Sequence, residues 1–111
     1  MSLTQTAVTV TATAVALLAV TASAQDAAAG AKVYADQKCS VCHSIAGKGN
    51  AKGALDDVGS KLSASDIRAW IEDAPAMTTK TKAARKPVMK TYSLAKPDVD
   101  ALVAYLSTLK K

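Results

Sequence analysis

The chain of 111 residues has few of the residue types from which most catalytic and metal sites are built. It contains one histidine, two cysteines, one tryptophan, three tyrosines and no phenylalanine. One histidine and two cysteines supply three ligands, one fewer than a structural zinc site needs. No second histidine remains for an acid–base constellation. With so few aromatic side chains, a domain of this size has a small core unless a bound group fills part of it.

Charged side chains are absent from residues 1–24, and all 14 basic and 9 acidic residues follow that stretch. Residues 14–20 are typical of the apolar part of a signal peptide, and Ala22-Ser23-Ala24 fits the small-x-small cleavage rule. We predict a signal peptide over residues 1–24, a mature domain over residues 25–111 and export to the periplasm. Residues 1–5 lack Lys and Arg, which leaves an upstream start codon and a retained membrane anchor as alternatives.

The cysteines and the histidine lie together as Cys39-Ser40-Val41-Cys42-His43. C-x-x-C-H is the pattern of covalent haem attachment. Two thiols three residues apart lie on neighbouring edges of one helical turn, where each can add to one vinyl group of the porphyrin. His43 then lies under the ring with an imidazole nitrogen on the iron. We predict that Cys39 and Cys42 attach one haem c and that His43 is the proximal iron ligand.

Three other interpretations of this motif are weaker. Zinc would lack a fourth protein ligand. A thioredoxin-like dithiol needs a βαβ setting, and no segment of the chain shows the alternation of a strand. A disulfide between Cys39 and Cys42 would close a loop too short to stabilise the chain much, and it would leave His43 unexplained.

The second axial position of the iron has two candidate ligands in the mature chain, Met77 and Met89. A thioether sulfur there raises the reduction potential. Most methionines fill core space, which suits Met77 because it lies close to the apolar residues of a predicted helix. Met89 lies among Lys and Arg residues, two positions after Pro87, in a segment without helical periodicity. We favour Met89 as the distal ligand, with Met77 and an open or lysine-ligated iron as alternatives.

The first and last helices of the mature domain are predicted from residue spacing. Residues 26–38 are compatible with a helix throughout. Residues 97–109 begin with Pro97 and carry one apolar stripe, as expected of a helix packed on a core. Gly30, a small residue, is expected to let the two helices cross closely near Tyr105.

A further helix is predicted over residues 63–74. Ser63-Ala64-Ser65-Asp66 resembles a capping box, and Pro75 is expected to end the helix. The stretch between the haem motif and Ser63 contains four glycines and is predicted to be loop. The fold class is therefore all-α, with three to four helices around one covalently bound haem.

These features together resemble the class I monohaem cytochrome c family, of the small bacterial periplasmic kind. The resemblance covers residues 28–110 and implies a cytochrome c fold in which the N- and C-terminal helices cross and a methionine loop closes the distal side of the haem. By position it implies that Cys39 and Cys42 attach the haem, with His43 as proximal and Met89 as distal ligand. The motifs that carry it are Gly30-x-x-x-Tyr34, the haem motif at 39–43, Gly53-Ala54-Leu55, Val58-Gly59, Ile67-x-x-Trp70-Ile71, Pro87-x-Met89 and Leu102-Val103-Ala104-Tyr105-Leu106.

One departure from the family concerns the loop that supports the proximal histidine. The family often has Gly-Pro-x-Leu where this chain reads Gly53-Ala54-Leu55-Asp56. In the family the carbonyl of that proline holds the imidazole N–H of the ligand. Ala54 also has a carbonyl group, so we expect the hydrogen bond to persist there in a less rigid loop.

The resemblance implies a single-electron carrier, not an enzyme, that shuttles electrons between membrane or periplasmic redox complexes. The net charge is +5, and five basic residues flank Met89. They form either a docking face for acidic redox partners or a solvated loop.

We expect a monomer without nucleic-acid binding or stable membrane insertion after cleavage. A sensory haem protein and a dedicated oxidoreductase subunit are the alternative classes. The basic residues are Lys80, Lys82, Arg85, Lys86 and Lys90.

Overall fold

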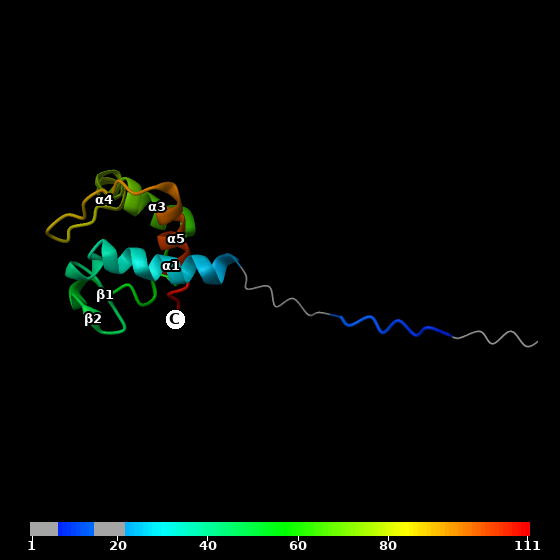
Figure 1. Ribbon diagram of the computed structural model, residues 1–111. Helices are drawn as coiled ribbons and strands as arrows, with labels where there is room; N and C mark the ends of the chain where they lie inside the picture. The colour runs from blue at the N-terminus through cyan, green and yellow to red at the C-terminus, as the bar shows by residue number, and fades with distance from the viewer. Residues whose placement is uncertain (1–6, 15–21) are drawn as a thin grey trace, which may run out of the picture.

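The computed structural model describes residues 7–14 and 22–111, and its folded part is mainly helical (Figure 1). A short antiparallel pair, β1 with β2, and two 3-10 turns complete it. The all-α prediction is confirmed, with strands of only two residues each as an addition. The elements are α1 (Ala22–Asp36), a 3-10 turn (Cys39–Val41), β1 (Ser44–Ile45), β2 (Lys48–Gly49), a 3-10 turn (Ala51–Gly53), α2 (Val58–Lys61), α3 (Ala64–Glu72), α4 (Ala74–Thr81) and α5 (Lys96–Ser107).

Helices α1 and α5 cross each other closely in the middle of the domain (Figure 1). Gly30 is buried at this crossing, where an added Cβ would overlap the carbonyl oxygen of Ala101 and lie 2.5 Å from Tyr105 Cβ. The rings of Tyr34 and Tyr105 meet edge to face beside it, with centroids 6.1 Å apart. The predicted crossing near Tyr105 is therefore confirmed, because only a residue without a side chain allows this approach.

The chain around Pro75 differs from the prediction. Ser63 does cap α3, since its hydroxyl accepts a hydrogen bond from the Asp66 backbone N–H at 3.1 Å. However, α3 ends before Asp73, and Pro75 lies in the first turn of α4. The Asp73 carboxylate caps that helix by accepting from the Ala76 N–H at 3.3 Å. The predicted helix end at Pro75 was wrong because a proline is tolerated where a helix begins, since no intrahelical bond is lost there.

The core lies between α1, α3 and α5, close to the point where α1 crosses α5. The stretch predicted as loop before Ser63 contains β1, β2 and α2 as well as turns, so that prediction was too simple. Helix α2 is tied to the end of the chain, because the Gly59 N–H donates to the Leu109 carbonyl at 2.8 Å. The buried cluster consists of Val33, Ile67, Ile71, Val99, Leu102, Val103 and Leu106.

The predicted signal peptide falls largely on residues 1–6 and 15–21, which lie outside the described residues. Within residues 7–14 and 22–111, no helix combines the length and the apolar character needed to cross a membrane. Cleavage after Ala24 stays a prediction; it would shorten α1 at its start and leave the crossing at Gly30 intact.

Candidate functional site

A cavity of about 850 Å³ lies between the haem motif, α3, α5 and the segment that leads into α5. Figure 1 shows that segment, in yellow, on the same side of the molecule as the end of α1. The walls are largely apolar, and the volume is within the range of cofactor pockets, roughly 300–1,000 Å³. All four side chains predicted for the site, Cys39, Cys42, His43 and Met89, line this one cavity.

The haem motif forms one tight turn directly after α1. Lys38, in the left-handed conformation with φ 56°, ends the helix and turns the chain into the 3-10 turn. The Cys39 carbonyl then accepts hydrogen bonds from the N–H groups of Cys42 at 3.1 Å and His43 at 2.9 Å. Both cysteines are free thiols. This local turn is the geometry that the C-x-x-C-H spacing predicts.

The imidazole of His43 is held by a backbone carbonyl, although not the expected one. Its Nδ1 lies 2.9 Å from the carbonyl oxygen of Gly53, whereas the sequence argument expected Ala54. In Gly-Pro-x-Leu the proline lies two residues before the leucine. Counted back from Leu55, that position is Gly53, and the structure uses the Gly53 carbonyl for this hydrogen bond. Because a carbonyl only accepts, Nδ1 carries the proton and Nε2 keeps its lone pair for a metal.

Burial governs the protonation of the groups at the site. Desolvation lowers the pKa of His43, and the hydrogen bond to Gly53 opposes part of that shift. Burial likewise raises the pKa of the Cys39 thiol. Burial, with smaller effects of nearby Cys39 and Tyr105, raises the pKa of Tyr34 to about 12. The Tyr34 hydroxyl is buried without a hydrogen-bond partner in the described part of the protein.

The two candidate methionines lie in different surroundings. Met89 is half-buried and lines the cavity. Met77 is 6% exposed, belongs to the buried face of α4 and is not among the residues that line the cavity. Met77 therefore has the position of a core residue, and the sulfur of Met89 is the one available to a group bound in the cavity.

Met89 lies in the segment between α4 and α5, residues 82–95, and two contacts of this Met89 segment were not predicted. The Tyr92 N–H donates to the Ile71 carbonyl at 3.0 Å, which attaches the segment to α3. The Arg85 guanidinium donates to the Cys42 carbonyl at 2.6 Å, which attaches it to the haem motif. The sequence argument counted Arg85 among the basic residues of a docking face or a solvated loop, and no local signal marks its bond to Cys42.

The cavity therefore presents two thiols, an imidazole nitrogen and a thioether within apolar walls, which is the donor set that a covalently attached haem requires. Within residues 7–14 and 22–111, no group of three or more His, Cys, Asp or Glu side chains could hold a metal ion.

Comparison with known families agrees with this geometry. The family model described as Cytochrome c matches residues 27–110. Searches of the curated proteins and of the solved structures found no match. The match spans most of the chain, so the chain belongs to the cytochrome c family, and the predicted resemblance is confirmed. Membership implies a covalently attached haem c and a role in electron transfer.

Proposed function

We propose that this cytochrome c is a single-electron carrier in which Cys39 and Cys42 would attach the haem and His43 and Met89 would bind its iron. The observation that carries the proposal is that these four side chains line one apolar cavity, whereas Met77 is buried in the core. The bound haem supplies one-electron chemistry, because its iron alternates between Fe(II) and Fe(III).

The protein's own groups attach, orient and shield the haem. Cys39 and Cys42 would hold the haem through thioether bonds, each formed by addition of one S–H across one vinyl C=C without an oxidant or reductant. The Gly53 carbonyl keeps the imidazole of His43 in the tautomer that leaves Nε2 free for iron. The apolar walls exclude water from the site. Val41, between the two cysteines, is 69% exposed, so a partner can approach the edge of the attachment turn closely.

Absorption spectra of the holoprotein, oxidised and then reduced, test the ligand assignment. The weak far-red band of methionine-ligated ferric haem should be present, lost in Met89→Ala and retained in the matched variant Met77→Ala. Met77→Ala should instead destabilise the core by about 2–5 kcal/mol. A far-red band that survives in Met89→Ala would overturn the assignment. A carbon monoxide affinity of the reduced, unmodified protein equal to that of Met89→Ala would favour the sensory alternative with an open distal site.

We propose further that the basic residues around Met89, from Lys80 to Lys90, form a docking face for acidic redox partners. Lys80, Lys82, Lys86 and Lys90 are exposed, and none pairs with a carboxylate in the described part of the chain. Val88 is 43% exposed, lines the cavity and lies between Lys86 and Lys90 in the sequence, so exposed apolar surface adjoins basic residues. Such a face attracts a negatively charged partner and speeds its approach at low salt.

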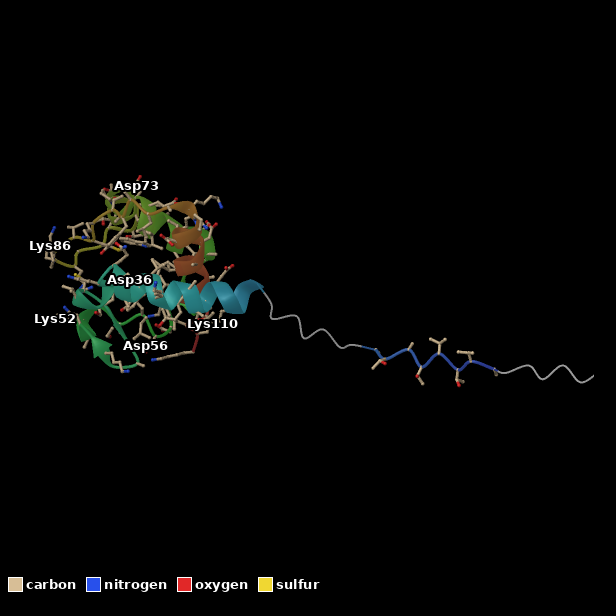
Figure 2. The ribbon with its side chains drawn as sticks, viewed as in Figure 1. Asp36, Lys52, Asp56, Asp73, Lys86 and Lys110 are labelled. Atoms are coloured by element: carbon tan, nitrogen blue, oxygen red, sulfur yellow. The ribbon has the colours of Figure 1, made fainter. Side chains whose placement is uncertain are left out.

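Charge reversal tests the docking face. The double variant Lys82→Glu/Lys86→Glu should slow oxidation of the reduced protein by hexacyanoferrate(III) at low ionic strength, with the difference shrinking as salt is added. Lys110→Glu/Lys111→Glu has the same change in net charge and is the matched control; Figure 2 shows Lys110 and Lys86 well apart. Equal rates for the two double variants would contradict the docking face and favour a merely solvated loop.

We also propose that the protein is exported to the periplasm and acts there as a soluble monomeric shuttle. The support is the composition of residues 1–24, which carry no charged side chain and end in a small-x-small sequence. N-terminal sequencing of the mature holoprotein should begin at Gln25. A chain that retains residues 1–24 in the membrane would contradict this proposal. A stoichiometric partner on purification would indicate a dedicated subunit instead of a free shuttle.

A further inference from the structure

The segment that carries Met89 has few attachments to the rest of the protein. It joins α4 to α5 and contains neither helix nor strand. At its ends, Lys82 and Ala95 are bonded to the adjoining helices α4 and α5. Between them the backbone is bonded at residue 83, to the Thr78 carbonyl at 3.1 Å, and at residue 92, to the Ile71 carbonyl at 3.0 Å. In the described part of the protein, residues 84–91 make a single hydrogen bond to the rest of the chain, from the Arg85 side chain to the Cys42 carbonyl.

The guanidinium of Arg85 lies against the proximal side of the site. Its Nη2 is 2.6 Å from the Cys42 carbonyl oxygen. It also packs on Gly53, where an added Cβ would overlap Arg85 Nη1 and lie 2.9 Å from Arg85 Cζ. Gly53 is the residue whose carbonyl holds His43. One side chain from the methionine segment thus contacts both backbone elements that support the proximal histidine.

We propose that Arg85 is a positioning residue that fastens the Met89 segment to the haem-attachment turn and holds a fixed positive charge beside the proximal ligand. The proposal rests on the ligand assignment given under the proposed function. Arginine suits this role because its charge is permanent and its planar fork can donate while it packs on a flat backbone. Lysine at the same position would keep the positive charge but lack the planar guanidinium and its several N–H donors.

Two consequences follow for the holoprotein. A segment fastened at Arg85 keeps the Met89 sulfur near the iron, so a competing ligand has to displace it from a restrained position. A positive charge close to His43 disfavours the additional positive charge of Fe(III), so it raises the reduction potential. The first effect depends on the hydrogen bond and the second on the charge, and the two can be separated by substitution.

The test compares Arg85→Gln, Arg85→Lys and the control Lys86→Gln, which removes one charge from the adjacent exposed residue. Arg85→Gln should raise the carbon monoxide affinity of the reduced holoprotein about tenfold, as expected for one lost charge-assisted hydrogen bond. It should also shift the Fe(II)/Fe(III) equilibrium about threefold toward Fe(III), or about 28 mV at 59 mV per tenfold change. Arg85→Lys should show the first effect and little of the second, and Lys86→Gln should show neither.

Carbon monoxide affinity and potential in Arg85→Gln equal to those of Lys86→Gln would overturn the proposal. If Arg85→Gln does not accumulate as holoprotein, Arg85→Lys decides, since an unchanged carbon monoxide affinity in that variant would overturn the fastening role. The far-red band distinguishes this failure from failure of the ligand assignment. If the band is absent from the unmodified protein, the assignment of Met89 is wrong and this inference fails with it. If the band is present, the assignment stands, and the Arg85 variants test the positioning role alone.

Discussion

Replacing Gly30 with alanine would probe the crossing of α1 and α5, which holds the first and last helices of the folded domain together. Within a helix, alanine is more favourable than glycine by about 1 kcal/mol, so propensity alone predicts a more stable variant. The new Cβ, however, would overlap the Ala101 carbonyl oxygen and lie 2.5 Å from Tyr105 Cβ. Neither atom is the end of a flexible side chain, so the helices themselves have to move apart.

Overpacking of a core costs about 1–3 kcal/mol, and the backbone obstruction at Ala101 favours the upper end of that range. We therefore expect Gly30→Ala to lower the free energy of unfolding by about 2 kcal/mol, the overpacking cost less the propensity gain. Urea unfolding of the holoprotein, followed by far-ultraviolet circular dichroism and haem absorption, measures this change. The comparison variant Ala29→Gly, at an exposed position of α1, should lose about 1 kcal/mol from propensity alone.

A Gly30→Ala protein as stable as the unmodified protein would refute the reasoning, because it would mean that the crossing has room for a methyl group. Combining it with Tyr105→Ala gives a second check. The close contact involves Tyr105 Cβ, which alanine retains, and the Ala101 carbonyl is unaffected. Truncating Tyr105 should therefore not rescue the stability of Gly30→Ala.

Three further predictions concern the cap of α3, a surface carboxylate bonded to two cationic side chains, and the haem itself. Ser63→Ala removes the acceptor for the Asp66 N–H and should destabilise the protein by about 0.5–2 kcal/mol in urea, whereas the exposed Ser65→Ala should cost less than about 0.5 kcal/mol. Hydrogen bonds from Lys96 and Arg68 lower the pKa of the Asp100 carboxyl, so its stabilising effect is present at neutral pH and is lost as pH falls through the folded-state pKa. Asp100→Asn should accordingly be less stable than the unmodified protein at pH 7 and indistinguishable from it at about pH 2; an equal deficit at both would contradict the linkage. Haem-free chain should be largely unfolded by circular dichroism, because the domain is small and its cavity is large; a cooperative unfolding transition of the apoprotein would count against this.

The sequence alone determined the features that depend on residues close together in the chain. Haem attachment requires two thiols and an imidazole at fixed local spacing, and Cys39, Cys42 and His43 have that spacing within a single turn. The all-α class follows from apolar periodicity, which reflects the geometry of each helix by itself. Gly30 could be assigned to the crossing because it has no side chain and lies four residues before Tyr34, on the same face of the first helix.

The tertiary structure decided what depends on contacts between distant segments. Sequence surroundings favoured Met89 over Met77 as a ligand, and only the tertiary structure shows that Met89 lines the cavity while Met77 is buried in the core. Pro75 begins a helix instead of ending one because Asp73 caps the next helix, an outcome that propensity alone does not distinguish. Arg85 reaches a carbonyl 43 residues away in the chain, and the nearby Lys82 and Lys86 carry the same charge. Such a partner depends on how loops pack across a cavity, which residue spacing does not encode.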